Sequence, residues 1–311
     1  MRHKVLITAP YMHREKEKIQ NMLKEFSFEV DWIPIEERLE EEDLLPVIGR
    51  YHAILCGDDK ITKKVIDAAV NLKVIVKWGT GIDSINKEYA KKKGIKVLRS
   101  PDAFTDPVAD SALALMLNEA RGLFRNDSIF KQGGWEKPQG HMLREKTIGI
   151  IGFGNIGRAV AKRLIPFGPK VMVNDIKKLG DKLLKSYNVT SASKDKIYKE
   201  CNIITLHSDL NPASQFLLNR GAFSKMKKKP YIINTARGPL IKETDLISAL
   251  RNGLISGVGI DVFEDEPLPR DHIFRSLTNV TASCHNTNSS PSCWNKIHKN
   301  SLKMLEEGLN S

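Results

Sequence analysis

The sequence has few residues from which a disulfide framework or a metal site is usually built. Four cysteines are spread along its 311 residues without the C-x-x-C spacing of a zinc ribbon: Cys56, Cys201, Cys284 and Cys293. His285 and His298 lie close to the last two cysteines, but structural zinc sites use closely spaced ligand pairs. Adjacent residues of an extended segment, such as Cys284 and His285, also point to opposite faces. We therefore expect neither a disulfide framework nor a metal site.

Long hydrophobic runs are missing as well. No apolar segment approaches the roughly 20 residues that span a bilayer. The opening "MRHKVLITAP" has a short apolar core, followed at once by the polar "YMHREKEKIQ", which is typical of a first β-strand and not of a signal peptide. We expect a cytoplasmic protein without a membrane partner.

Aromatic residues make up only 7% of the chain, and they are not interleaved with its positive charge. The formal net charge is +12, but the lysines form short clusters, as at 91–93 and 225–229. Both clusters lie where a helix is expected to end, a position at which the helix dipole favours cations. Proteins that bind single strands combine such charge with aromatic platforms, so we expect no nucleic-acid partner.

The arrangement of apolar segments predicts two α/β domains. Four short runs in the first hundred residues, at 4–9, 53–57, 73–78 and 95–98, alternate with amphipathic stretches such as 14–26 and 62–71. A second series of strands follows at 147–152, 170–175, 202–207, 231–236, 255–262 and 279–284. Strands that alternate with helices form parallel, doubly wound sheets, and a chain of this length accommodates two of them.

One long helix is predicted between the two series. Asp106 is expected to cap its N-terminus and Pro107 to be its first residue, with Gly133 and Gly134 after its end. Its apolar residues recur at helical spacing: Ala109, Leu113, Met116, Leu117, Ala120 and Phe124. Such a helix could bridge two domains, form a subunit contact or simply pack inside one domain.

The stretch "TIGIIGFGNIGRAV" at 147–160 predicts a dinucleotide site. Gly152, Gly154 and Gly157 follow a β-branched run and precede a helix, which is the context that this glycine spacing requires. These glycines permit a tight turn, a close approach of the backbone to a pyrophosphate and close packing of helix on strand, and the helix N-terminus attracts phosphate. A P-loop would need Gly-Lys-Ser/Thr, and a kinase would need H-R-D and D-F-G, none of which is present.

Asp175 ends the next predicted strand, 18 residues after Gly157. A carboxylate at this point accepts hydrogen bonds from the adenosine ribose and repels a 2′-phosphate. The sequence therefore favours NAD over NADP, although Lys177 and Lys178 could weaken the preference.

Three further strand ends carry an arginine, a group of acids and a histidine. Arg237 follows the strand at 231–236, the acids of "DVFEDEP" follow the next strand, and His285 follows the last. Open α/β sheets bind ligands at these ends; arginine suits carboxylate recognition and histidine suits proton transfer. Taken singly, the arginine could equally form a surface ion pair, one of the acids could cap a helix, and the histidine could belong to the core.

These segments resemble the D-isomer-specific 2-hydroxyacid dehydrogenases, the family that includes 3-phosphoglycerate, glycerate and D-lactate dehydrogenases. The resemblance spans nearly the whole chain through the order and spacing of its motifs: "KWGTGID" (77–83), "VADSALALML" (108–117), "TIGIIGFGNIGRAVAKRL" (147–164), "NIITLH" (202–207), "INTARGPLI" (233–241), "GVGIDVFEDEPLP" (257–269) and "NVTASCH" (279–285). It implies that an NAD-binding Rossmann domain, 101–284, is inserted into a Rossmann-like or flavodoxin-like substrate-binding domain, 1–100 plus 285–311. No regulatory domain is expected after it.

The resemblance also assigns site residues. The catalytic trio would be Arg237, Glu266 and His285, with Glu264 and Asp265 as bystanders. The substrate carboxylate would bind Arg237 and the backbone N–H groups of the loop Trp78, Gly79, Thr80 and Gly81. Asp261 would hold the nicotinamide carboxamide, and the cofactor-binding residues would be Gly152, Gly154, Asn155, Ile156, Gly157, Asp175, His207, Thr235, Ala236 and Asp261.

The implied activity is hydride transfer between NAD(H) and a small D-2-hydroxy acid or 2-oxo acid, in a homodimer formed through the cofactor domain and the 106–132 helix. An NADH-sensing corepressor on the same fold remains an alternative, as does a preference for NADPH. Some residues depart from the usual family pattern: Asp209 replaces proline in "LHSDL", Cys284 and Asn286 flank the histidine in "CHNTNSS", and Asp110 replaces glutamate.

Overall fold

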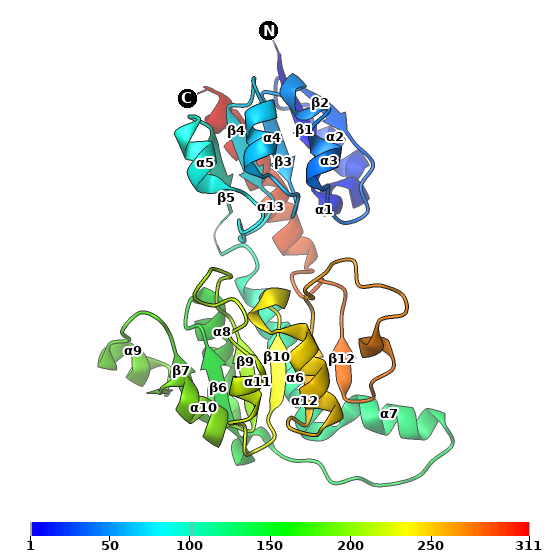
Figure 1. The fold of residues 1–311 in the computed structure, drawn as a ribbon, viewed down its shortest axis with the longest axis vertical. Helices are drawn as coiled ribbons and strands as arrows, with labels where there is room; N and C mark the ends of the chain where they lie inside the picture. Colours follow the sequence, from blue (N-terminus) through cyan, green and yellow to red (C-terminus); the bar gives the residue numbers. More distant parts are fainter. Residues whose placement is uncertain (1, 101, 311) are drawn as a thin grey trace. The chain divides into compact units, whose positions relative to one another are not determined.

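The computed structural model describes residues 2–100 and 102–310 of the chain (Figure 1). Two compact units share the fold: Met1–Phe104 with Ser289–Ser311, and Thr105–Asn288. The second unit is continuous in sequence and interrupts the first. The divisions lie four residues beyond the boundaries that we predicted at 100/101 and 284/285.

The first unit contains a five-stranded parallel sheet. Its strands are β1 (His3–Ile7), β2 (Phe28–Trp32), β3 (Ala53–Cys56), β4 (Val74–Lys77) and β5 (Lys96–Arg99), in the order β2-β1-β3-β4-β5. This is the flavodoxin-like order, in which the winding reverses between β1 and β3. The sequence pattern did not predict β2, because this edge strand reads FEVDW and its acidic residues alternate with apolar ones.

Helices cover this sheet, and the last of them comes from the end of the chain. They are α1 (Pro10–Arg14), α2 (Lys16–Leu23), α3 (Glu41–Leu44), α4 (Lys63–Ala68), α5 (Lys87–Lys92) and α13 (Pro291–Asn310), with a 3₁₀ turn, η1, at Ile48–Arg50. Helix α13 packs on β3, β4 and β5 with buried residues at helical spacing, among them Ile297, Leu302 and Leu305. Gly308 allows this approach, because a Cβ there would lie 2.7 Å from a methyl of Val74.

The second unit contains a seven-stranded parallel sheet. Its strands are β6 (Thr147–Ile151), β7 (Lys170–Asn174), β8 (Thr190–Ser191), β9 (Ile203–Leu206), β10 (Tyr231–Asn234), β11 (Gly257–Ile260) and β12 (Val280–Ala282), in the order β12-β11-β10-β9-β6-β7-β8. This is the Rossmann order extended by one strand, and its winding reverses between β6 and β9. Both sheets confirm the predicted fold class. The two-residue β8 was not predicted.

The helices of the second unit are α6 (Thr105–Arg121), α7 (Leu123–Lys131), α8 (Asn155–Leu164), α9 (Asp181–Ser186), α10 (Lys194–Glu200), α11 (Arg220–Phe223) and α12 (Glu243–Arg251). Four 3₁₀ turns accompany them: η2 (Leu143–Glu145), η3 (Ile165–Phe167), η4 (Gly238–Leu240) and η5 (Ile273–Arg275). Buried Val, Ile and Leu side chains of the strands form the core of the unit, as expected of a parallel sheet covered on both faces.

The single helix predicted from Asp106 to Gln132 is wrong in two respects. Gly122 adopts a left-handed conformation, with φ of 63°, and separates α6 from α7. Helix α6 already includes Thr105, so Asp106 lies inside its first turn instead of capping it. Asp106 and Asp110 both bond to Arg163 of α8, at 2.8 and 2.6 Å.

Among the described residues, no helix combines the length and apolar character that crossing a membrane requires.

Candidate active site

The glycine turn after β6 has the backbone geometry that a pyrophosphate cradle needs. Gly152 has φ of 94°, and a Cβ there would lie 2.5 Å from the carbonyl carbon and oxygen of His207. At Gly157 a Cβ would overlap the carbonyl oxygen of Gly152, so helix and strand can approach only without side chains. Gly154 is exposed and is the N-cap of α8, so the first turn of this helix, which begins with Asn155 and Ile156, follows the glycine turn directly.

Asp175 is bonded to the same turn from the end of β7. Its Oδ2 accepts the N–H of Phe153 at 2.7 Å, and its Oδ1 accepts the N–H of Lys177 at 2.9 Å. Each oxygen keeps further acceptor capacity, so the carboxylate can hold the turn and still accept a ribose hydroxyl.

His207 follows β9, on the other side of the point where the strand order reverses. Its Nε2 bonds to Oγ1 of Thr205 at 2.9 Å, and burial lowers the pKa of His207 to about 3, so its ring is neutral. Within residues 2–100 and 102–310, its buried Nδ1 has no partner, and neither has the buried Oγ1 of Thr235 after β10. Buried polar atoms without partners are rare, so both atoms fit residues that contact a bound cofactor.

Asn234 shapes the turn that carries Ala236 and Arg237. Its amide donates to the carbonyl of Arg237 at 2.8 Å and accepts the N–H of Ala236 at 3.1 Å, while Arg237 Nη1 donates to the carbonyl of Ala236 at 2.7 Å. The next residue, Gly238, packs directly on the backbone of Phe263, where any Cβ would overlap. The arginine turn and the loop after β11 are therefore held against each other.

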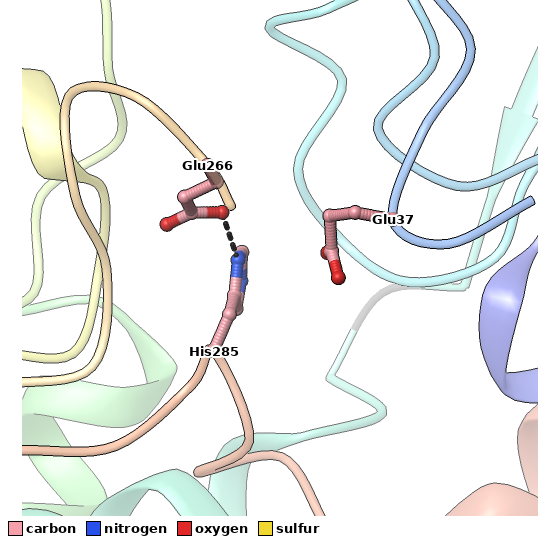
Figure 2. Close-up of side chains that lie close together, drawn as sticks. All are labelled: Glu37, Glu266 and His285. Carbon is pink, nitrogen blue, oxygen red and sulfur yellow. Dashed lines mark hydrogen bonds and ion pairs between the residues drawn. The ribbon is translucent and has the colours of Figure 1, made fainter. Parts of the chain in front are cut away.

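Glu266 and His285 form a close pair (Figure 2). Oε2 of Glu266 lies 2.8 Å from Nδ1 of His285, and Oε1 accepts the N–H of Phe263 at 2.8 Å. An ionised carboxylate only accepts hydrogen bonds, so Nδ1 carries the proton in the neutral ring and Nε2 is left as the base. This arrangement can take up a proton at Nε2 and stabilise the resulting cation.

Asp261, at the end of β11, is fully buried (0% exposed) and is bonded to the loop that carries His285. Its carboxylate accepts hydrogen bonds from Ser283, Asn286 and Thr287, and its carbonyl accepts the N–H of His285. The predicted contact with a nicotinamide carboxamide stays a prediction.

In the first unit, the structure corrects one part of the predicted carboxylate loop. The N–H of Trp78 donates to the carbonyl of Cys56 at 2.9 Å, because the ladder between β3 and β4 continues one residue past the strand. The carbonyls of Gly79 and Thr80 accept bonds from Ser100 and Arg99. Since a trans peptide directs its N–H opposite to its carbonyl, the amides of Thr80 and Gly81 point away from these partners and can bind an anion.

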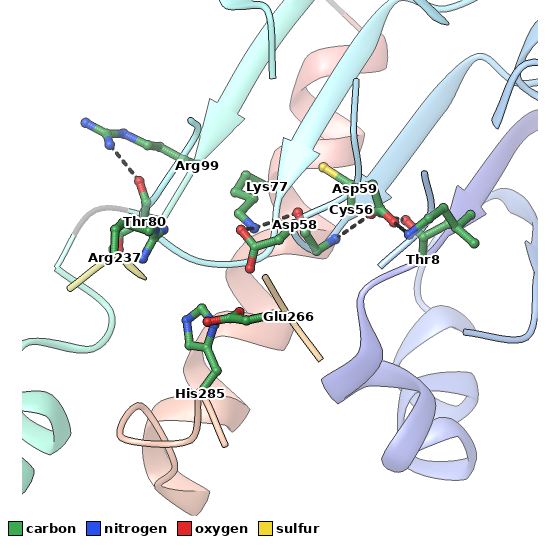
Figure 3. A network of polar contacts seen from close by, with 12 residues as sticks. Thr8, Cys56, Asp58, Asp59, Lys77, Thr80, Arg99, Arg237, Glu266 and His285 are labelled. Atoms are coloured by element: carbon green, nitrogen blue, oxygen red, sulfur yellow. Dashed lines mark hydrogen bonds and ion pairs between the residues drawn. The ribbon is translucent and has the colours of Figure 1, made fainter. Parts of the chain in front are cut away.

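Two networks at the strand ends of the first unit were not predicted (Figure 3). Lys77 is buried and donates to Asp58 at 2.7 Å and to the carbonyl of Gly57 at 2.6 Å. Asp59 accepts bonds from Thr8 Oγ1 at 2.7 Å, from Leu39 N at 2.7 Å and from Gly57 N at 2.9 Å, while burial raises its pKa. The available signal was their position at the carboxyl ends of strands: Thr8 follows β1, Asp58 and Asp59 come shortly after β3, and Lys77 is the last residue of β4.

Comparison with known proteins identifies the family. The pattern described as "D-isomer specific 2-hydroxyacid dehydrogenase, NAD binding domain" matches residues 113–287. The chain belongs to the D-isomer-specific 2-hydroxyacid dehydrogenases. It is 38% identical over 290 residues to a hydroxypyruvate reductase from Thermotoga maritima, covering 91% of each chain. It is also 38% identical over 262 residues to a glyoxylate reductase from Thermofilum pendens, covering 82% of this chain and 76% of that protein.

A solved structure agrees with this assignment. The D-lactate dehydrogenase from Aquifex aeolicus, in complex with NAD and lactic acid, superposes with a TM-score of 0.86 at 26% identity, covering 97% of this chain and 94% of that one. The predicted family, the NAD cofactor and the oxidoreductase activity on 2-hydroxy acids are confirmed.

The residues in which this dehydrogenase departs from its family have defined places. Asp110 pairs with Arg163. Asp209 is exposed. Its backbone carbonyl accepts hydrogen bonds from the Ser214 hydroxyl at 2.6 Å and from the side-chain amide of Asn211 at 3.3 Å, and these two bonds close the loop after β9. Cys284 is exposed, and Asn286 donates its N–H to Asp261 at 2.9 Å.

Proposed function

We propose that the dehydrogenase uses Arg237, Glu266 and His285 to interconvert a small D-2-hydroxy acid and its 2-oxo acid. The observation that carries this proposal is the 2.8 Å bond between Glu266 Oε2 and His285 Nδ1, because it fixes Nε2 as the proton-transferring atom. Glyoxylate and hydroxypyruvate, after which two relatives are named, are the first candidates as substrates. Phosphohydroxypyruvate and pyruvate are the next.

Each group has a defined part in the proposed chemistry. Bound NAD(H) supplies or accepts the hydride at C2. Nε2 of His285 takes the hydroxyl proton during oxidation and returns it during reduction, and Glu266 keeps the ring oriented and stabilises its charged form. Arg237 binds the carboxylate and polarises the carbonyl oxygen. In the first unit, the amides of Thr80 and Gly81 are proposed to bind the substrate carboxylate.

The cofactor-binding residues that we propose are those around the glycine turn. The amides of Gly154, Asn155 and Ile156 would bind the pyrophosphate, and Asp175 the adenosine ribose. His207, Thr235 and Ala236 would complete the site at the ends of β9 and β10. Substitution of Asp175 by serine should narrow the preference for NADH over NADPH.

A spectrophotometric screen tests the proposal. Purified protein is mixed with NADH or NADPH and with glyoxylate, hydroxypyruvate, phosphohydroxypyruvate, pyruvate or a bulky branched 2-oxo acid. We expect rapid oxidation of NADH, in preference to NADPH, with at least one of the small acids. Tight NADH binding without turnover of any acid would contradict the proposal and favour an NADH-sensing regulator.

We also propose a homodimer formed through the second unit. Between 123 and 142, several large apolar side chains are exposed, including Phe130 at 67% and Trp135 at 78%. Monomeric proteins rarely expose so many together, and a second copy of the chain could cover them. Sedimentation of the wild type as a monomer would contradict the dimer.

We further propose that the protein is located in the cytoplasm. Its four cysteines are all free thiols, which agrees with a reducing compartment.

A further inference from the structure

We propose that Glu243, the first residue of α12, is a positioning residue that fixes Glu266 by binding both ends of the loop at 264–272. This inference rests on the proposed role of Glu266 beside His285. The residues concerned all lie in the second unit. The sequence motifs single out neither Glu243 nor its partner His272.

The loop is attached at its beginning to the N-terminus of α12. Oε1 of Glu264 accepts the N–H of Glu243 at 2.5 Å. Lys242, the residue before this helix, provides no side-chain cap, so Glu264 satisfies an amide that the helix itself leaves open. The helix dipole favours a carboxylate at this end. Glu264 therefore has a structural part beside the catalytic acid that follows two residues later.

The end of the loop is attached to the side chain of the same residue. Nε2 of His272 lies 3.0 Å from Oε1 of Glu243, and Nδ1 of His272 accepts the N–H of Phe274 at 3.3 Å. Because Nδ1 accepts a hydrogen bond, the neutral ring carries its proton on Nε2 and donates it to the carboxylate. The two side chains are only 17% and 21% exposed, so water competes little for this bond.

The segment between these attachments is also bonded on both sides of Glu266. Before it, the N–H of Phe263 donates to Oε1 of Glu266 at 2.8 Å. After it, the carbonyls of Leu268 and Pro269 accept the guanidinium of Arg275, both at 3.0 Å. The carboxylate of Glu266 is therefore carried by a chain segment whose course is set by its ends.

Apolar contacts lie next to the polar attachment. Phe263 and Phe274 are buried, with ring centroids 6.2 Å apart, and the ring of His272 meets that of Phe274 edge-on at 4.7 Å. Loss of the Glu243 side chain would leave the N–H of His272 without its acceptor in a largely buried place. The aromatic packing would remain, so we expect the loop to loosen while the unit stays folded.

A positioning role of Glu243 can be separated from a purely stabilising one. A residue that only stabilises the fold lowers kcat whichever side chain occupies position 266. A residue that acts through Glu266 lowers kcat only while that carboxylate is present to be misplaced. Effects of residues that act as a unit are not additive, so a double-mutant cycle between Glu243 and Glu266 distinguishes the two roles.

The experiment combines Glu243→Ala with Glu266→Gln. It measures kcat of the wild type, both single variants and the double variant, at saturating NADH and with the 2-oxo acid that the wild type reduces fastest. Hydrogen exchange of the amides at 262–272, followed by mass spectrometry, reports on the loop itself. Glu243→Gln is the conservative variant, because its amide oxygen can still accept the N–H of His272. Asp265→Ala, which alters an exposed acid of the same loop, is the matched control.

We expect Glu243→Ala to lower kcat about tenfold in the presence of Glu266, since misplacing a reacting group by about 1 Å costs up to about 10²-fold. Beside Glu266→Gln, the same change should lower kcat less than about twofold. The amides at 262–272 should exchange several-fold faster. Glu243→Gln should retain most of the rate and of the protection, and Asp265→Ala should match the wild type. Equal losses of kcat in both backgrounds, or unchanged exchange, would overturn the proposal.

A second variant covers the case in which Glu243→Ala does not fold. His272→Phe keeps a ring against Phe274 but removes the bond to Glu243, so it should reproduce the loss of kcat and the faster exchange. A wild-type kcat in this variant would overturn the proposal. If the wild type reduces no 2-oxo acid, the proposed function fails, while the exchange at 262–272 still decides whether Glu243 holds the loop.

Discussion

Glu266 is bonded at both of its oxygens, to Nδ1 of His285 at 2.8 Å and to the N–H of Phe263 at 2.8 Å. The second bond prevents the carboxylate from rotating away from the imidazole. Glu264, two residues earlier, instead accepts the N–H of Glu243 at 2.5 Å, and Asp265 is exposed. Of three neighbouring acids, the fold therefore brings only Glu266 against His285.

Glu266→Gln should lower kcat about 10²-fold, because a neutral amide keeps the shape of the side chain but does not stabilise a protonated imidazole. Binding of NADH should stay within twofold of the wild type. Steady-state kinetics over a range of pH values measure the change, with Asp265→Asn as the control. A wild-type kcat in Glu266→Gln would exclude this residue from proton transfer.

Arg237→Ala should lower kcat/KM about 10³-fold, in the upper range for loss of one charged hydrogen-bond donor to the reacting oxygen. Arg237→Lys should recover only part of the loss, because an ammonium cannot form the paired bonds of a guanidinium. NADH titration should give nearly wild-type affinity for both variants. Full activity of the alanine variant would remove Arg237 from the mechanism.

Three glycine substitutions should have different effects. Gly152→Ala places a Cβ 2.5 Å from the backbone of His207 at positive φ, so it should destabilise the fold by about 2 kcal/mol or more and weaken NADH binding. Gly154→Ala faces open space and should weaken NADH binding without changing the Tm. Gly180→Ala, also in open space but outside the glycine turn, should change neither. Thermal unfolding and NADH titration distinguish these patterns. Equal stability of all three variants would contradict the expected overlap at Gly152.

Stability of the first unit should fall in mild acid because of His298. Nδ1 of this buried ring accepts Nε1–H of Trp78 at 3.0 Å, and burial lowers the pKa of His298 to about 4. The nearby Glu15 carboxylate, 3.4 Å from Nε2, opposes this shift only in part. The unfolded chain binds the proton with a pKa near 6.5, so the contribution of neutral His298 is complete above pH 6.5 and disappears as the pH falls to about 4.

The loss amounts to about 3 kcal/mol for the difference between these two pKa values. Urea unfolding at pH 7.5 and pH 5, followed by tryptophan fluorescence, measures about 2 kcal/mol of this loss, because pH 5 covers only the part of the window between 6.5 and 5. His298→Gln, which can still accept the bond from Trp78, should lose correspondingly less stability between the two pH values. The control, His141→Gln, alters an exposed ring and should follow the wild type. Parallel pH curves for wild type and His298→Gln would contradict the prediction.

Much of the fold could be predicted because it depends on short patterns. Buried runs such as 147–151 and 203–206 form strands where their β-branched residues recur, and the glycine spacing fixes the turn that follows β6. By contrast, β2 was missed because its burial alternates, and the helix of 106–132 was predicted as continuous although Gly122 interrupts it. A single glycine in a helical pattern does not reveal whether it will adopt the left-handed conformation.

The sequence by itself determined the class of the protein: two parallel α/β sheets, a dinucleotide turn with Asp175 after the next strand, and the motifs of one family. The tertiary structure decided which groups are paired. It bonded Glu266, which the family resemblance had already named, to His285; it occupied the N–H of Trp78 with the carbonyl of Cys56, and it gathered the donors of the 283–287 loop around Asp261. The physical reason is that local patterns specify backbone conformation, whereas a hydrogen bond between residues 19 or 26 positions apart depends on which strand ends become neighbours in the sheet.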